Sequence, residues 1–266
     1  AVALLVERPT GLGVPEVLVT DVRAALGPLA ARLAGDPSRT LRCLGVTGTN
    51  GKTTTTYLLH GIATAAGERA GLIGTTGARV GERTVPVGFT TPEASDLQRL
   101  LAEMRDEGVT TVALEVSSHA LAQHRVDGTR FAVACFTNLS RDHLDFHGTM
   151  ERYFTAKAML FTTDRCRTVV TNLEDPYGVR LVAQAAAEGL ACVTYAVADP
   201  AADVGAEAPA PTSTGTAFTL VDRRTGERAE IDLRLVGRVG ALERHRVARA
   251  RERRVLLGGD LAQQFF

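Results

Sequence analysis

The sequence predicts an α/β protein built on a doubly wound, mostly parallel β-sheet. From Leu41 onward, short apolar runs alternate with segments whose apolar residues recur at helical spacing. Several of these runs are almost continuously apolar, which is typical of strands buried on both faces of a parallel sheet. The first of them ends in a glycine-rich stretch that leads directly into a helical pattern.

The predicted elements fall into two parts and a tail. Residues 1–38 contain two short apolar runs, VALLVE and EVLVT, and a helical stretch, which indicates the end of a separate α/β unit; GDPSRT, at 35–40, predicts a linker or turn. Residues 39–235 form the second predicted domain. Its expected strands are 41–47, 71–76, 109–116, 131–138, 167–172 and 191–197, and its expected helices begin at Lys52, Thr90, Tyr153 and Tyr177. Residues 216–235 alternate around RRTGER and predict a β-hairpin, whereas residues 236–266 are arginine-rich and unpatterned.

Composition narrows the class of protein. The chain has 266 residues, 45% of them hydrophobic, and a formal net charge of zero, so we expect no nucleic-acid partner. It has no apolar run of about 18 residues, so we expect no membrane insertion. It opens with AVALLVERP, without Met or a basic leader, so we expect a cytoplasmic protein whose natural start lies upstream. The four cysteines are widely spaced, and we expect buried free thiols.

The stretch GVTGTNGKTTTT, residues 45–56, predicts a variant phosphate-binding loop. Glycines at 48 and 51 permit a sharp turn and a close approach of backbone N–H groups to an anion. Lys52 then begins a helix whose positive dipole end faces the same place, and Thr53 offers a hydroxyl to Mg²⁺. The loop is a variant because the first glycine of G-x-x-x-x-G-K-[ST] would fall at Val46.

Two further features indicate the chemistry. Of 30 basic residues only Lys52 and Lys157 are lysines, so these positions need a compact charge or a reactive amine. Glu115 ends an apolar strand at the edge where parallel sheets bind ligands, which favours a magnesium ligand over a simple strand-end carboxylate. The next strand leads into NLSRDHLDFH, whose spacing favours one magnesium ligand with structural hydrogen bonds over a zinc site.

Five segments, in order, resemble the Mur ligases of peptidoglycan synthesis: GVTGTNGKTTTTYLL, GFTTPEASDL, ALEVSSHALAQHRVDG, FTNLSRDHLDFHGTMERYFTAKAMLF and TNLEDPYG. The third and fourth are most similar to the MurE type. The resemblance implies an ATP-dependent amide ligase that uses Mg²⁺, phosphorylates the D-glutamate carboxylate of UDP-MurNAc-L-Ala-D-Glu, and lets a diamino acid attack the acyl phosphate. The resemblance leaves open whether the diamino acid is diaminopimelate or lysine. Nothing in the sequence suggests an assembly larger than a monomer, so we expect a monomer.

The resemblance also implies the roles of individual residues. The ATP phosphates would be held by Gly48, Thr49, Asn50, Gly51, Lys52, Thr53 and Thr54. One magnesium ion would be bound by Thr53 and Glu115 and a second by His143, and a carbamylated Lys157 would also bind magnesium. The catalytic residues would be Lys52, His143 and Lys157. The UDP-MurNAc dipeptide would contact Thr90, Thr91, Ser117, Gln123 and Arg125. Asn172 and Asp175 would lie near adenine.

Some of these residues also have a purely structural interpretation. Thr90 and Glu93 have the spacing of a capping box at the start of a helix. Ser117 and Gln123 could serve only to satisfy the backbone of their loop. The stretch NLEDPYG, which contains Asn172 and Asp175, predicts a plain turn as strongly as it predicts an adenine site.

The chain departs from the family at both ends. Residues 1–38 would be the remnant of the uridine-nucleotide domain. Residues 236–266 lack the family's continuation, so we expect a frameshift or truncated end there, no C-terminal ligase domain, and a chain that is inactive alone. Two competing classes of protein remain possible on the sequence: a ligase like folylpolyglutamate synthetase, and a non-catalytic ATP-binding remnant.

Overall fold

The computed structural model describes residues 3–81 and 83–234; the predicted tail at 236–266 lies outside the described residues. Its strands are β1 (Leu4–Val6), β2 (Glu16–Leu18), β3 (Arg42–Thr47), β4 (Ala70–Gly74), β5 (Gly77–Val80), β6 (Arg83–Val85), β7 (Thr111–Glu115), β8 (Phe131–Phe136), β9 (Cys166–Asn172), β10 (Ala191–Ala196), β11 (Val204–Pro211), β12 (Thr216–Asp222) and β13 (Glu227–Leu233). Its helices are α1 (Val22–Leu33), the 3₁₀-helix η1 (Pro37–Arg39), α2 (Lys52–Ala65), α3 (Ala94–Asp106), α4 (Ser118–Ala122), α5 (Leu144–His147), α6 (Met150–Ala158) and α7 (Pro176–Ala187).

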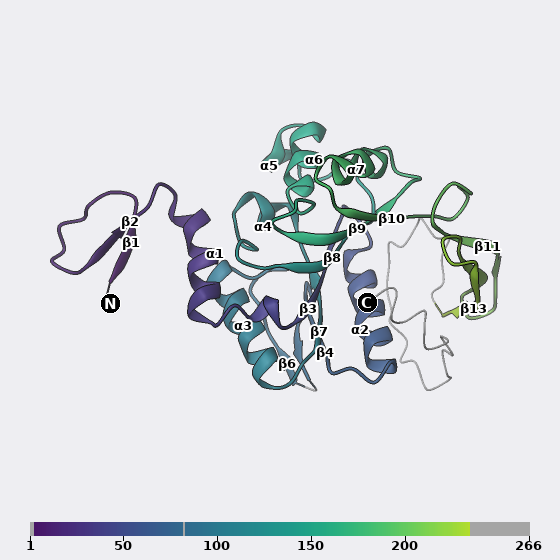
Figure 1. Cartoon of the computed structure of the whole chain (residues 1–266), viewed down its shortest axis with the longest axis horizontal. Helices are drawn as coiled ribbons and strands as arrows, with labels where there is room; N and C mark the ends of the chain where they lie inside the picture. Colours follow the sequence, from purple (N-terminus) through teal and green to yellow (C-terminus); the bar gives the residue numbers. More distant parts are fainter. Residues whose placement is uncertain (1–2, 82, 235–266) are drawn as a thin grey trace.

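One eleven-stranded sheet organises the fold, in the order β13-β12-β11-β10-β9-β8-β3-β7-β4-β5-β6. The pairings from β11 to β4 are all parallel, and antiparallel strands extend both edges. Helix α2 covers one face of the central strands, and α1 and α3 lie on the other (Figure 1). This arrangement confirms the predicted doubly wound α/β class. It also brings the carboxyl ends of β3, β7 and β8 together, where such sheets bind ligands.

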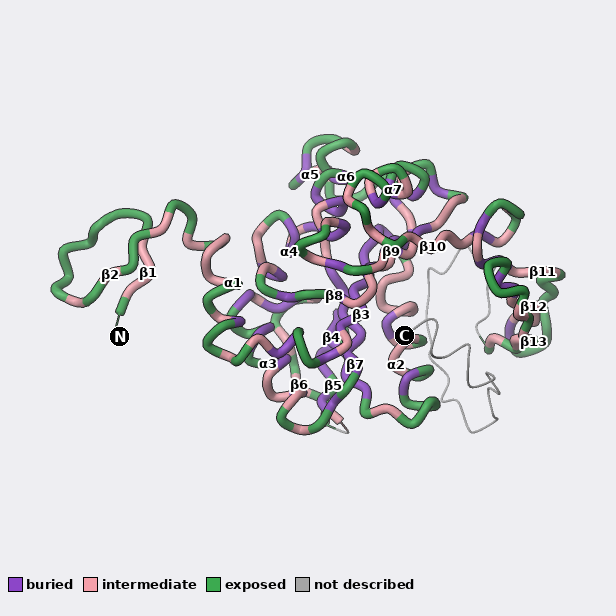
Figure 2. Tube along the Cα trace, in the orientation of Figure 1, coloured by how far each residue is buried: buried purple, intermediate pink, exposed green. Residues whose placement is uncertain are grey.

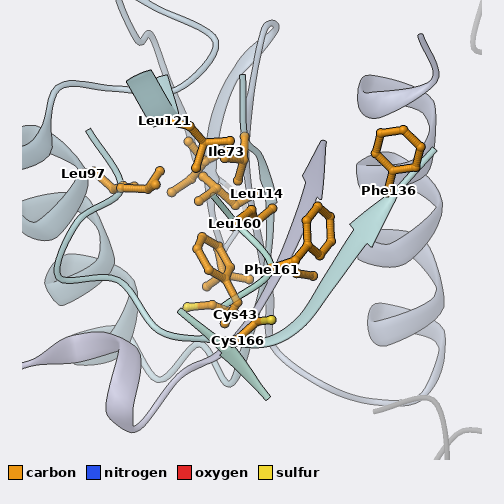
Figure 3. Packing of buried hydrophobic residues seen from close by; sticks show 14 of the residues in the cluster. Cys43, Ile73, Leu97, Leu114, Leu121, Phe136, Leu160, Phe161 and Cys166 are labelled. Carbon is orange, nitrogen blue, oxygen red and sulfur yellow. The ribbon is translucent and has the colours of Figure 1, made fainter. Parts of the chain in front are cut away.

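The central strands form the core (Figure 2). Leu114 on β7 and Ile73 on β4 pack with Leu97 of α3 and Leu121 of α4 (Figure 3). All four cysteines are free, as expected; Cys43 and Cys166 are buried, while Cys135 and Cys192 are only partly so. Among the described residues, no helix is long and apolar enough to cross a membrane.

The N-terminal segment packs against the rest of the described chain through α1. Strands β1 and β2 pair in parallel as a separate two-stranded sheet, which Figure 1 shows away from the main body. Helix α1 packs on α3, and Gly27 lies so close to the loop before β8 that a Cβ there would be 2.2 Å from the Asp127 carbonyl oxygen. The division into a 1–38 remnant and a 39–235 domain remains a prediction.

Three predictions about elements were wrong or incomplete. The expected strand at 71–76 ends at Gly74, because the chain turns there and returns as β5 and β6, which pattern analysis missed. Strand β11 was also missed, since VGAEAPAP lacks the β-branched and aromatic residues that mark strands. The helix expected from Thr90 begins at Ala94 without a side-chain cap, so the capping box with Glu93 does not form; Thr90 Oγ1 instead hydrogen-bonds Thr75 Oγ1 at 3.1 Å.

Candidate nucleotide and substrate site

The predicted phosphate loop lies between β3 and α2 and depends on its glycines. Gly48 and Gly51 have φ values of +149° and +86°, and a Cβ on Gly48 would lie 1.9 Å from Thr137 Oγ1. Gly51 precedes α2 and gives it no side-chain cap. Because the first N–H groups of a helix have no partner within the helix, those of α2 are available to an anion.

The loop is fastened to the segment that follows β8. Asn138 Oδ1 accepts from the Asn50 N–H at 3.0 Å, and Asn138 Nδ2 donates back to the Asn50 carbonyl at 3.2 Å. Thr137 Oγ1 donates to the same carbonyl at 2.6 Å. The Thr49 hydroxyl accepts from the Ser140 N–H at 3.0 Å and donates to the Ser140 carbonyl at 3.2 Å. Hydrogen bonds within the chain therefore hold the loop in this shape.

Both lysines of the chain point into this loop. Lys52 Nζ donates to the carbonyls of Gly48 and Thr49 at 2.9 and 2.8 Å. Lys157 Nζ, on α6, donates to the same Gly48 carbonyl at 2.8 Å, and the residue is only 1% exposed. Burial, and then the nearby Lys52 charge, hold the pKa of Lys157 well below its usual range. Burial also lowers the pKa of Lys52.

Glu115 lies at the end of β7, beside the loop. Its Oε2 accepts from Thr53 Oγ1 at 2.9 Å, and its Oε1 accepts from the Thr75 N–H at 3.0 Å. The residue is 1% exposed, and its carboxylate makes no ion pair within the described part of the chain. A buried carboxylate paired only with neutral hydroxyl and amide groups matches the hard oxygen ligands that Mg²⁺ prefers.

His143 is less firmly held than Glu115 and Lys157, the two buried residues among the predicted metal ligands. It precedes α5 with φ +50°, its side chain is 48% exposed, and its Nε2 lies 3.4 Å from Asp142 Oδ2. Within the described residues, no hydrogen bond or ion pair joins it to Thr53, Glu115 or Lys157, and no three His, Cys, Asp or Glu side chains gather closely enough to hold a metal. Of the predicted metal ligands, only Thr53 and Glu115 are in direct contact among the described residues, and they form no closed cage.

Most residues expected to contact the dipeptide substrate do come together. Thr91 Oγ1 donates to the Glu115 carbonyl at 2.8 Å and accepts from the Ser117 N–H at 3.1 Å. Arg125 donates to the Thr91 carbonyl at 3.3 Å and to Gln123 Oε1 at 2.7 Å, while its buried Nε has no partner among the described residues. Ser117 caps α4, in agreement with its structural interpretation, and leaves its side chain half-buried beside Thr91.

Asn172 and Asp175 form a turn, which is one of the two predictions made for NLEDPYG. Asp175 caps α7 through the Tyr177 N–H, and its other oxygen accepts from the Leu139 N–H at 2.7 Å. Asn172 donates to the Thr137 carbonyl at 3.1 Å and accepts from the Glu174 N–H. Their contact with adenine remains a prediction.

Sequence reasoning missed three residues at this site: Thr137, Asn138 and Tyr153. The first two directly follow β8, so the rule that ligands bind at the carboxyl ends of parallel strands could have found them. Tyr153 gave no signal, because a tyrosine in an apolar helical pattern predicts only a core residue.

Comparison with known proteins agrees with this geometry. Residues 46–242 match the family model for the Mur ligase middle domain. The chain belongs to the Mur ligase family. The predicted resemblance is thereby confirmed, and Gly48, Glu115 and Lys157 all lie within the matched segment.

Relatives within the Mur ligase family agree on the type. The chain is 46% identical over 227 residues to the UDP-N-acetylmuramoyl-L-alanyl-D-glutamate–2,6-diaminopimelate ligase of Geobacillus thermodenitrificans, covering 83% of this chain and 46% of the relative. It is 51% identical over 189 residues to the ligase of the same name from Corynebacterium glutamicum, covering 70% of this chain and 37% of that one. The chain thus spans about half or less of the length of these relatives.

Among the solved structures, a 2,6-diaminopimelate ligase resembles this chain more than a folylpolyglutamate synthase does. A 2,6-diaminopimelate ligase structure matches with a TM-score of 0.77 and 33% identity, over 86% of this chain and 47% of that one. A folylpolyglutamate synthase from Mycobacterium tuberculosis, solved with ADP and AMPPCP, matches with a TM-score of 0.59 and 16% identity, over 75% of this chain and 51% of that one. The latter likeness concerns the fold alone.

Proposed function

We propose that this chain carries the ATP-binding part of a MurE-type ligase that joins 2,6-diaminopimelate to UDP-MurNAc-L-Ala-D-Glu. The observation that carries the proposal is that the only two lysines of the chain meet at one carbonyl oxygen of the phosphate loop. The names of the relatives favour diaminopimelate over lysine as the diamino acid. ATP and UDP-linked substrates occur in the cytoplasm, and we propose that the protein is located there. We also propose that it is a monomer.

The loop residues Gly48–Thr54 would hold the ATP phosphates through backbone N–H groups and the positive charge of Lys52. Thr53, Glu115, His143 and modified Lys157 would hold magnesium, and the oxygen-rich pair of Thr53 and Glu115 fits that ion. Bound magnesium would supply positive charge that offsets the repulsion between the phosphates and the substrate carboxylate. Lys52 supplies the same kind of stabilisation from the protein itself.

Lys157 would act as a carbamate. The lone pair of its neutral amine attacks the carbon of CO₂, an N–C bond forms, one C=O π bond becomes a C–O⁻ group, and one amine proton leaves to solvent. Its burial favours the neutral amine that this step needs, and the product is an anion that guanidinium cannot form. Carbamylation would thus replace an amine, which repels cations when it is protonated, with an anionic metal ligand beside Lys52.

The group of Thr90, Thr91, Ser117, Gln123 and Arg125 would orient the dipeptide end of the substrate. Arg125 is 8% exposed and pairs with Glu93 Oε1 at 3.0 Å, and its guanidinium would attract an incoming carboxylate. Asn172 and Asp175 would shape the adenine side of the site. With the substrate and ATP bound in this way, the reacting carboxylate would lie between the phosphate loop and Arg125.

Isothermal titration calorimetry on the 266-residue chain tests the proposal. We expect Mg·ATP to bind, and Lys52→Met to weaken that binding at least about tenfold. Arg42→Met, which removes a cation at the other end of β3, should bind like the wild type. Equal affinities for all three proteins would contradict the proposal.

A second titration separates the MurE type from its two competitors. UDP-MurNAc-L-Ala-D-Glu and dihydrofolate are compared as ligands of the Mg·ATP-loaded chain. Binding of the first alone supports the MurE assignment, whereas binding of dihydrofolate alone would favour a folylpolyglutamate synthetase. ATP binding with no phosphate release, even in the presence of both ligase substrates and the remaining domains of a relative, would favour the non-catalytic remnant.

A further inference from the structure

Tyr153 of α6 contacts both the phosphate loop and the side chain of Lys157. It is 1% exposed, and its hydroxyl lies 3.3 Å from Thr49 Oγ1 in the phosphate loop. Either of the two hydroxyl groups can donate in this bond. The Nζ of Lys157 lies 4.6 Å from the centroid of the same ring.

Helix geometry explains the double contact. Tyr153 and Lys157 are four residues apart on α6, so they lie on one face of the helix, one turn from each other. The His147 ring lies 4.9 Å from the Tyr153 ring, and its Nε2 is 2.9 Å from Ser118 Oγ. The tyrosine ring is thus held among His147, Lys157 and the loop, and has little freedom to move.

We propose that Tyr153 is a positioning residue whose hydroxyl holds the phosphate loop through Thr49 and whose ring holds Lys157 Nζ against Gly48. This inference rests on the proposed function and adds a residue to it. A phenylalanine would fill the same core volume, whereas a buried hydroxyl is unfavourable unless it finds a partner. Here that partner belongs to the nucleotide loop. The four-carbon side chain of Lys157 could otherwise adopt several rotamers, and the adjacent Tyr153 ring restricts them.

The two contacts can be separated by substitution. Tyr153→Phe removes the hydroxyl and keeps the ring, and Tyr153→Leu removes both. Mg·ATP affinity is measured by calorimetry, and the carbamate of Lys157 by its ¹³C resonance in ¹³C-bicarbonate buffer. We expect Tyr153→Phe to weaken Mg·ATP about fivefold and leave the carbamate signal unchanged. We expect Tyr153→Leu to weaken Mg·ATP similarly and to lose most of the carbamate signal.

Phe154→Leu is the matched control. Phe154 is the next residue on α6, is also buried, and packs on Tyr177 and Arg180 instead of the loop. Its substitution should lower the melting temperature and leave both signals unchanged. If Tyr153→Leu fails to fold, Tyr153→Phe decides the inference alone through its ATP affinity.

The outcomes distinguish this inference from the function beneath it. If the wild type binds Mg·ATP and shows the carbamate, but Tyr153→Phe binds as the wild type does, Tyr153 is only a core residue and the inference is overturned. The same follows if Phe154→Leu weakens ATP binding as much as Tyr153→Phe does. A wild type with neither signal would overturn the proposed function itself, and this inference with it.

Discussion

Lys52 and Lys157 come from separate helices, α2 and α6, yet their side-chain nitrogens share one acceptor, the Gly48 carbonyl oxygen, at 2.9 and 2.8 Å. Two ammonium groups cannot stay charged at one carbonyl without strong mutual repulsion. The structure therefore favours one charged and one neutral lysine, and Lys157 is the more deeply buried.

Lys157→Arg tests the need for an amine. Arginine is always protonated and cannot carry a carbamate, and its larger head must enter a fully packed site. We expect the ¹³C carbamate signal to vanish and the free energy of unfolding to fall by about 1–3 kcal/mol. A retained carbamate signal in this variant would place the modification on another amine.

Gly48→Ala tests the shape of the loop. The added Cβ would collide with Thr137 Oγ1, so the loop must open, and we expect Mg·ATP binding measured by calorimetry to be lost. Gly61→Ala is the control, because a Cβ at that position in α2 meets nothing within 4 Å. There we expect a gain in stability of about 0.5–1 kcal/mol with unchanged ATP affinity. Normal ATP binding by the Gly48 variant would refute the loop assignment.

Glu115→Gln tests the metal site. The change keeps the side-chain volume and removes the charge, so Thr53 retains a neighbour while magnesium loses an anionic ligand. We expect ATP affinity to stop responding to Mg²⁺ between 0 and about 10 mM, as followed by calorimetry. Glu230→Gln, at an exposed position of β13, should respond as the wild type does. An unchanged magnesium response at Glu115 would move the metal elsewhere.

The lowered pKa of His147 predicts that the free energy of unfolding falls at acid pH. Burial, together with the nearby charges of His119, Lys157 and His143, lowers its pKa to about 4 from 6.5. Between these values the unfolded chain binds more protons than the folded one, so this contribution to stability is lost as pH falls from 6.5 to 4. The loss should be on the order of 1–3 kcal/mol. Urea unfolding across that range should show a flatter pH dependence for His147→Gln; an unchanged slope would assign the titration to another group.

Much of the site could be predicted because its residues lie where a strand ends. Gly48, Lys52 and Glu115 are marked by local pattern alone: a glycine turn, a helix start and an acid after an apolar run. The contacts of Thr91 with Ser117 and Arg125 could not be predicted in detail, since they depend on how two separate loops fold back toward β7.

Three strands and one tyrosine had no local signal at all. Strands β5 and β6 are short, and β11 is rich in alanine and proline, so pairing to neighbours rather than propensity makes them strands. Tyr153 resembles any core aromatic until its hydroxyl is seen on Thr49. Its role depends on a contact across 104 residues, which periodicity does not reveal.

The position of β3 in the sheet also constrains how the protein is made. Its two partners are β7 and β8, so the strand that leads into the phosphate loop is not fully paired until Phe136 has left the ribosome. About 90 residues are synthesised between the end of β3 and the end of β8, which takes roughly 5–20 s at ordinary elongation rates. During this time an apolar strand and a glycine loop are exposed, and pairing over such separations is slow. We therefore expect nascent chains that end before β8 to bind chaperones and not ATP.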